Sequence, residues 1–318
     1  MNNKIAIVGM SGMFPEATDL NEFYTNLLNK VDSVQEPTVE RLIHSSADPT
    51  KKYKVAGHLE RVDLFDHKFF GISKKEAEFM EPSQRLALQL CCEAIENAGY
   101  GLKDLENSDT ALYLTTNSYT PVQYRNRITE SHLEQDPTIH TGNLSSMVYG
   151  RIAYCLKLQG PAVMIDTGCS SSLIAIDQAC EKLLNNRAGA ALVGGINLKI
   201  NFFYAGDTKG HLGASSPQGK TRAFDADADG IGVGEGGGML FLKRYEDAVR
   251  DNDNIHAVIL GTGITQDGGR SNSIAAPSPA AQTKAITKAW DIAGIEPQSI
   301  SYVEAHGAGT PLGDMIEF

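Results

Sequence analysis

The amino-acid sequence predicts an α/β fold in which a mainly parallel sheet is buried between layers of helices. Three observations support this prediction. Short, unbroken apolar runs, which are typical of strands buried on both faces, recur along the chain. Segments with the helical spacing of apolar residues separate these runs. Glycine, or a Gly-Pro pair, stands where many of these segments end.

The composition is that of a globular protein. The chain has 318 residues, of which 42% are hydrophobic and 21% are charged, and this length is sufficient for a buried core. A formal net charge of −11 argues against a nucleic-acid-binding protein. No apolar run reaches the roughly 18 residues of a membrane span, and the amino terminus does not resemble a signal peptide. The five cysteines form no CxxC pair, so we expect a cytoplasmic protein with reduced thiols.

The first third of the chain begins with a short apolar run over 4–9, which predicts a buried strand. Apolar spacing predicts helices over 20–28 and 83–98. The scattered prolines, glycines and charges of 35–75 indicate a long irregular excursion at the surface. Residues 109–116 predict the next strand.

The middle of the chain continues the alternation of helices and strands. In order, the pattern predicts a helix over 145–158, a strand over 162–165, a helix over 170–184 and strands over 190–198 and 239–243. A glycine-rich segment, 225–238, precedes the last of these strands.

A new block begins near Ile255, with a strand over 256–264, a helix over 279–293 and a strand over 300–304. Its opening, VILGTGI, is similar to the AIVGMSG that opens the chain. The sequence therefore predicts two related halves, with the first at 1–250 and the beginning of the second at 251–318.

Cys169 stands at the junction of the predicted strand 162–165 and the predicted helix 170–184. Gly168 permits a tight turn there, and a helix N-terminus favours a thiolate and can hold an oxyanion. A nucleophile is one interpretation and a buried structural cysteine is the other. The structural interpretation is the expectation for the four cysteines that fall in helices among apolar neighbours, Cys91, Cys92, Cys155 and Cys180.

The segment around Cys169, IDTGCSSSL, resembles the nucleophile motif of the β-ketoacyl synthases, the condensing enzymes of fatty-acid and polyketide assembly. Further segments resemble the family in the same order over nearly the whole chain: IAIVGMSGMFP, FFGIS, EAEFMEPSQRLALQ, TGNLSSMVYGRIAYCLKLQGPA, SPQGKTRAFDADADGIGVGEGGG, DGGRSNSIAAPS and VEAHGAGTPLGD. The opening and the excursion after Gln35 are most similar to polyketide synthase modules. The resemblance implies a thiolase-like fold in α-β-α-β-α layers with an incomplete second half, and a homodimer formed through the first half.

The resemblance also implies a reaction in two stages. Cys169 takes an acyl group from a phosphopantetheine thioester, and a malonyl-type extender on an acyl carrier protein then loses CO₂ and attacks the acyl-cysteine. His306 matches a family histidine that polarises the malonyl carbonyl, and Thr310 matches a residue that contacts the pantetheine arm. No metal and no directly bound cofactor are implied, because phosphopantetheine arrives on the carrier protein. The other histidines are expected to be surface or satisfied residues: His44, His58, His67, His132, His140, His211 and His256.

The chain departs from the family pattern at several positions. Ala308 replaces a threonine, which is expected to remove a pantetheine contact worth about 1 kcal/mol. Met315 stands where proline is usual, and Val233 where arginine is common. The family's second histidine motif and its glycine-rich oxyanion loop do not occur before Phe318. We therefore expect that this piece alone does not complete a condensation and that its second half leaves an apolar face uncovered.

Three other patterns resemble parts of different sites, and we set the first two aside. DADADG, from Asp225, begins like a calcium-binding EF-hand loop, but its twelfth position is Gly236 instead of glutamate. We therefore interpret this segment as a glycine-rich loop near the active site. Residues 232–237 match G-x-G-x-x-G without the strand and helix that a dinucleotide site requires. The run Lys-Lys-Tyr-Lys at 51–54 is typical of a solvated face, and a docking surface for an acidic carrier protein is the alternative.

Three functions remain open from the sequence. The first is a chain-extending ketosynthase, and the second is a non-elongating relative that passes acyl groups through Cys169. The third is an inactive module for dimerisation or carrier docking. Cys169 argues against the third, because nothing structural requires a cysteine at that junction.

Overall fold

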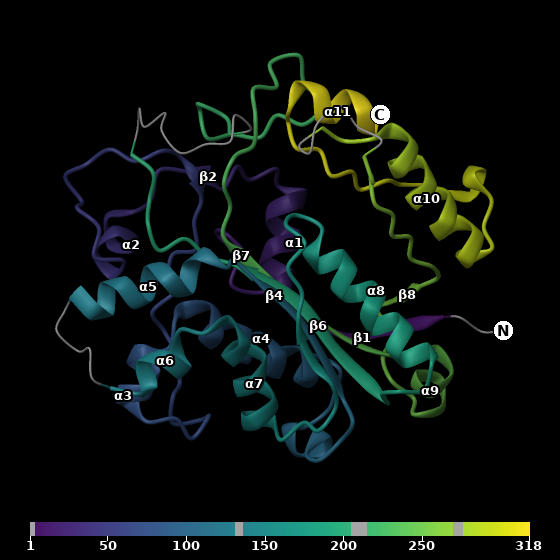
Figure 1. Ribbon diagram of the computed structural model, residues 1–318, viewed down its shortest axis with the longest axis horizontal. Coiled ribbons are helices and arrows are strands. Elements are labelled where there is room, and N and C mark those ends of the chain that lie inside the picture. Colours follow the sequence, from purple (N-terminus) through teal and green to yellow (C-terminus); the bar gives the residue numbers. More distant parts are fainter. Residues whose placement is uncertain (1–3, 131–135, 205–214, 270–275) are drawn as a thin grey trace.

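A mixed six-stranded sheet forms the centre of the molecule (Figure 1). The computed structural model describes residues 4–130, 136–204, 215–269 and 276–318. Within them, the sheet has the strand order β5-β4-β6-β7-β1-β8. The strands are β1 (Ile5–Met13), β4 (Ala111–Thr116), β5 (Ala162–Met164), β6 (Ala190–Asn197), β7 (Gly236–Arg244) and β8 (Ala257–Ile259).

The strand directions correct one expectation. β4 runs parallel to β5 and β6, whereas β7 is antiparallel to β6 and β1, and β8 is antiparallel to β1. The prediction of a mainly parallel sheet is therefore wrong. β7 begins beside the end of β6, where Gly236 pairs with Asn197, so the two neighbouring strands run in opposite directions. Burial on both faces gives a central antiparallel strand the same unbroken apolar run as a parallel one.

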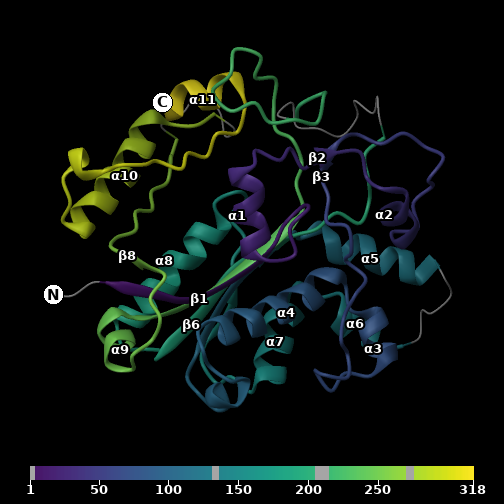
Figure 2. The same cartoon turned by 180° about the vertical axis from the view of Figure 1, so that it is seen from behind.

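Helices cover both faces of the sheet (Figures 1 and 2). α4 (Pro82–Asn97) and α7 (Ser145–Leu156) pack on one face, and α8 (Ser171–Leu184) packs on the other. β4 shows how the strand divides its side chains between the two layers. Leu112 and Leu114 join the core under α4 and α7, and Tyr113 joins the core under α8, as the two-residue period of a strand requires.

Shorter elements surround this core. The irregular excursion 35–75 holds only short pieces, and β2 pairs with β3 in a separate antiparallel sheet. No helix of the described residues is long and apolar enough to cross a bilayer. The remaining elements are α1 (Leu20–Leu28), β2 (Val34–Gln35), α2 (Val39–His44), β3 (Ala56–Gly57), α3 (Lys74–Phe79), η1 (Leu102–Leu105), α5 (Tyr119–Glu130), α6 (Thr138–Gly142), α9 (Tyr245–Arg250), α10 (Pro279–Ala293), η2 (Pro297–Ser299) and α11 (Pro311–Glu317).

The second block adds to the first sheet and builds no second sheet among the described residues. Its predicted helix is confirmed as α10, but only three residues of the predicted strand 256–264 pair, as β8. The predicted strand 300–304 is wrong, because the structure assigns no strand there. A strand requires a neighbour that accepts its backbone hydrogen bonds, and the described residues offer none beside this segment.

Glu81 caps the start of α4 from a fully buried position. Its carboxylate oxygens accept hydrogen bonds from the backbone N–H groups of Ser83 and Gln84, at 2.8 and 3.0 Å. Burial outweighs these donors and raises the pKa of Glu81 to about 7. Compared with the unfolded chain, the folded protein therefore favours the protonated form of Glu81, although the cap uses its carboxyl oxygens as acceptors.

The raised pKa of Glu81 predicts a loss of stability in neutral and alkaline solution. Its usual value is 4.5, so its contribution is fully present below that pH and is lost as the pH rises through about 7. We expect Glu81→Gln to raise the free energy of unfolding at pH 8 by roughly 1–3 kcal/mol more than at pH 4.5. Urea unfolding of the unchanged chain and of Glu81→Gln across this pH range measures the difference. Glu60→Gln, at an exposed position, is the control and should have the same pH profile as the unchanged chain. If the free energies of unfolding of the unchanged chain and of Glu81→Gln change with pH in parallel, the prediction is wrong.

Candidate active site

Cys169 lies on an exposed turn between β5 and α8. Gly168 has a φ of +69°, a conformation that favours glycine. The turn is held by its own side chains, because Ser171 Oγ accepts from the Thr167 N–H at 2.8 Å and donates to the Gly168 carbonyl at 2.7 Å. The predicted arrangement of strand, glycine turn and helix is thus confirmed, and the thiol lies at the positive end of the α8 dipole.

The other cysteines lie inside helices, as expected for structural residues. Cys91, Cys92 and Cys180 are buried, and Cys155 is half-buried. Burial is the main cause that raises the pKa values of Cys92 and Cys180 to about 12, and it raises that of Cys155 as well. At neutral pH these groups are therefore unreactive thiols, which leaves Cys169 as the exposed cysteine of the chain.

His306 is exposed and lies in a turn that α11 holds in place. The Glu317 carboxylate accepts hydrogen bonds from the backbone N–H groups of His306, at 2.5 Å, and Gly307, at 2.8 Å. One turn earlier on α11, the Asp314 carboxylate accepts from the Gly309 N–H at 3.0 Å. Two carboxylates of one short helix thus fix the backbone on which the histidine stands.

The same turn is attached to the glycine-rich segment 225–238. The Gly230 N–H donates to the Gly309 carbonyl at 2.9 Å, and the Phe224 N–H donates to Asp314 Oδ2 at 2.7 Å. This segment therefore supports the His306 turn. The sequence placed it near the active site but gave no partner for it.

The acidic start of this segment uses its carboxylates within the protein. Asp225 accepts from the Asp227 N–H at 2.8 Å, and Asp229 lies 3.6 Å from Arg222. No cluster of three metal-ligating side chains occurs among the described residues. β7 begins inside the glycine run, where a dinucleotide fingerprint would require a helix.

Thr310 has a structural role that the sequence analysis missed. It is the N-cap of α11, and its Oγ1 accepts from the Gly313 N–H at 3.2 Å. The hydroxyl hydrogen is still available to donate, so capping is compatible with a contact to a pantetheine arm. Ala308 is half-buried and Met315 is 81% exposed; nothing in the structure explains why methionine stands at 315.

The structure brings the two candidate turns to one side of the molecule without joining them. The N-terminal end of α8, where Cys169 stands, is the end nearer α11 in both views (Figures 1 and 2). No described hydrogen bond or ion pair connects Cys169 with His306. The motif DGGRSNSIAAPS spans residues 270–275, which are outside the described residues, as are His132 and His211.

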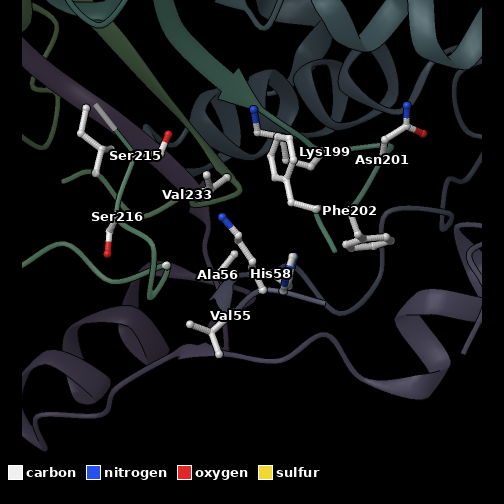
Figure 3. A pocket seen from close by; sticks show the side chains of 13 residues that line it. Val55, Ala56, His58, Lys199, Asn201, Phe202, Ser215, Ser216 and Val233 are labelled. Carbon is white, nitrogen blue, oxygen red and sulfur yellow. The ribbon is translucent and has the colours of Figure 1, made fainter. Parts of the chain in front are cut away.

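A small pocket lies where the chain leaves β6 (Figure 3). Its volume is about 30 Å³, which is enough for one or two waters. Val233 lines it together with Phe202 and His58, so the valine that replaces a common arginine contributes to an apolar wall. The ring nitrogens of His58 are buried without a hydrogen-bond partner in the described structure. The expectation of a surface or satisfied histidine is therefore wrong at this position.

Behind this pocket lies a buried ion pair that the sequence analysis missed. Arg41 and Glu235 meet at 2.8 Å, with side chains 1% and 0% exposed. Glu235 also accepts from the backbone N–H groups of Leu59, at 2.9 Å, and Lys199, at 2.8 Å. His58 Nδ1 is 3.7 Å from Glu235 Oε2, which permits electrostatic attraction but is too long for a hydrogen bond. No local sequence signal joins Arg41 to a residue 194 positions away.

Comparison with known families gives two matches that together cover nearly the whole chain. Residues 2–248 match the model of the beta-ketoacyl synthase N-terminal domain, and residues 256–318 match that of the C-terminal domain. Polyketide synthase PksN of Bacillus subtilis is 38% identical over 98% of this chain, which is 6% of the relative. A phenolphthiocerol/phthiocerol polyketide synthase of Mycobacterium tuberculosis is 40% identical over 99% of this chain, which is 17% of the relative.

Solved structures agree with these matches. The ketosynthase from module 6 of the bacillaene synthase of Bacillus subtilis 168 superposes with a TM-score of 0.85 at 38% identity. A ketosynthase domain of oxazolomycin assembly from Streptomyces albus superposes with a TM-score of 0.84 at 30% identity. Each covers 99% of this chain, and the chain spans 53% and 54% of their respective lengths.

Proposed function

The chain belongs to the β-ketoacyl synthase family, as a ketosynthase domain of the modular polyketide synthase type. From this premise we propose that it forms an acyl-cysteine at Cys169 and that a ketosynthase with its full set of catalytic residues extends this acyl group by decarboxylative condensation. The observation that carries the proposal is the placement of Cys169. Its thiol is exposed at the start of α8, whereas the other four cysteines are buried or half-buried in helices.

In the first stage the Cys169 thiolate attacks the carbonyl carbon of a pantetheine thioester. A new carbon–sulfur bond forms, the old one breaks, and the pantetheine thiolate leaves and takes up a proton. The positive end of α8 favours the attacking thiolate, and its free backbone N–H groups can stabilise the oxyanion that forms on the carbonyl.

In the second stage a malonyl-type thioester loses its carboxylate as CO₂. The electron pair of the broken carbon–carbon bond moves toward the thioester oxygen, where negative charge develops. We assign to His306 the hydrogen bond that stabilises this charge. The enolate carbon then attacks the acyl carbonyl on Cys169, and the cysteine leaves as thiolate. The carboxylates of Glu317 and Asp314 support the role by holding the backbone beneath His306.

The partners follow from the same proposal. The acyl and malonyl groups arrive on the phosphopantetheine arm of an acyl carrier protein, with the Thr310 hydroxyl as one contact and no other cofactor. A homodimer is supported by β5, which is an edge strand of the described sheet with Val163 38% exposed. A cytoplasmic location is part of the proposal on the basis of the composition.

Intact-mass spectrometry of the chain after incubation with an acyl-pantetheine thioester tests the first stage. We expect a gain of one acyl group, and peptide mapping should place it on Cys169. A chain that is folded by circular dichroism and gains no mass would refute the proposal.

His306→Ala separates the two stages. Because His306 acts only after Cys169 is loaded, we expect the variant to acylate at a rate within about tenfold of wild type. Release of CO₂ from a malonyl-pantetheine thioester should fall by at least about 100-fold relative to the unchanged chain. Equal losses in both assays would mean that His306 supports the fold of the site instead of the second stage.

A further inference from the structure

A second cavity is lined in part by the first half of α4. This helix packs on the face of the sheet that α8 does not cover (Figure 2). Its volume is about 570 Å³, within the range of small-molecule sites. The walls come from the chain after β1, from residues 59–64, from the first half of α4 and from Leu198. No residue of the Cys169 turn or the His306 turn lines it, so it is separate from the candidate active site.

The polar group that distinguishes this cavity is the guanidinium of Arg85. The residue is only 9% exposed, and its Nε has no hydrogen-bond partner among the described residues. Nη1 makes one long contact, at 3.3 Å, to the Asp63 carbonyl. Buried charges in proteins are normally paired, so a cavity wall that carries an unpaired guanidinium indicates that an anion completes it.

The nearby carboxylates have other partners. Asp63 binds Arg61 through both oxygens, at 2.8 and 2.7 Å. The oxygens of Glu81 cap α4, and burial raises its pKa to about 7, which limits its negative charge in neutral solution. No carboxylate of the described part of the chain forms an ion pair with Arg85. Arg85 interacts electrostatically with Glu81, but the described residues give its guanidinium no counter-ion in an ion pair.

The other walls define what kind of anion fits. Apolar side chains provide space for an aliphatic body, and Gln89 adds a second polar contact. The exposed acidic residues Glu16, Glu22 and Glu60 stand around the cavity and repel a multiply charged ligand. The apolar lining is formed by Met13, Phe14, Ala17, Leu59, Val62, Leu64, Leu86 and Leu198.

We propose that this cavity binds an aliphatic monocarboxylate, whose carboxylate pairs with Arg85 and whose chain lies against the apolar wall. A charge-assisted pair between guanidinium and carboxylate supplies orientation, and burial of the chain supplies affinity. The inference does not rest on the proposed acyl transfer at Cys169. Binding here and acylation there are separate measurements.

Isothermal titration calorimetry of the 318-residue chain with sodium octanoate tests the inference. We expect one saturable site. Octanamide has the same aliphatic chain as octanoate but no charge, and it should bind at least about tenfold more weakly than octanoate. Octyl phosphate carries more negative charge than octanoate and should also bind at least about tenfold more weakly. An octanoate titration without a saturable site, or octanamide binding as well as octanoate, would overturn the inference.

Variants locate the site. Arg85→Gln should weaken the binding of octanoate at least about tenfold and leave the binding of octanamide unchanged. Leu64→Trp, at a lining position that is 58% exposed, should fill the cavity and weaken both ligands. Arg187→Gln, the control, removes one positive charge from an exposed position outside the cavity. It should change the affinity for neither octanoate nor octanamide. If Arg85→Gln does not fold, Leu64→Trp decides. Octanoate binding that survives Leu64→Trp unchanged would show that it binds elsewhere.

Discussion

Cys169→Ala is expected to lower acylation of the chain by an acyl-pantetheine thioester at least about 1,000-fold. The reason is that a thioester exchanges rapidly only with a thiolate that it can reach. Cys169 is exposed at the turn into α8, and alanine keeps the turn while removing the sulfur. Time-resolved intact-mass spectrometry measures both rates on the same thioester.

Cys155→Ala provides the matched control. Cys155 is the next most accessible cysteine, but it is half-buried on α7 and burial raises its pKa. Its removal should change the acylation rate by no more than about twofold. If Cys155→Ala removes the acyl group and Cys169→Ala does not, the assignment of the nucleophile is wrong, even though the fold and the family remain.

Local features of the structure were predictable because local residues decide them. The helices over 20–28 and 279–293 have the predicted bounds, since the Asp19 cap, the Ser278 cap and the Gly294 stop are all readable in the sequence. The Cys169 turn was predictable for the same reason. Gly168 and the following serines specify it within a few residues.

Features that depend on distant residues were not predictable. Strand direction depends on where the chain re-enters the sheet, and the apolar run of β7 carries no sign of it. The strand expected at 300–304 has the composition of a strand but no neighbour among the described residues. In the sequence, Arg85 is an ordinary polar residue of an amphipathic helix. Only the fold reveals that its guanidinium is buried beside a cavity and forms no ion pair with a described carboxylate.

The buried pair of Arg41 and Glu235 leads to the largest expected effect on stability. Glu235→Ala should lower the free energy of unfolding by about 3–5 kcal/mol, because it leaves a guanidinium buried without its counter-ion. It also removes the acceptor for the backbone N–H groups of Leu59 and Lys199, and unsatisfied buried donors are costly. Denaturant unfolding at pH 7 measures the loss.

The pH dependence should change in the same variant. Burial acts to raise the pKa of Glu235, but His58, the Arg41 charge and the two backbone donors outweigh it, so that the pKa lies below its usual value of 4.5. A lowered folded-state pKa contributes stability above that value and loses it as the pH falls through the folded pKa. Glu235→Ala should therefore unfold with less dependence on pH below about 4.5 than the unchanged chain.

Two further variants separate burial of the pair from loss of charge. Glu106→Ala breaks an ion pair with Lys157 at 2.9 Å whose side chains are 33% and 58% exposed, so its loss should stay below about 1 kcal/mol. The double variant Arg41→Met, Glu235→Leu removes both charges and should recover part of the stability lost in Glu235→Ala. It should not recover all of it, because the N–H groups of Leu59 and Lys199 still lack an acceptor. Equal losses in Glu235→Ala and Glu106→Ala would show that burial adds nothing to the cost of breaking this pair.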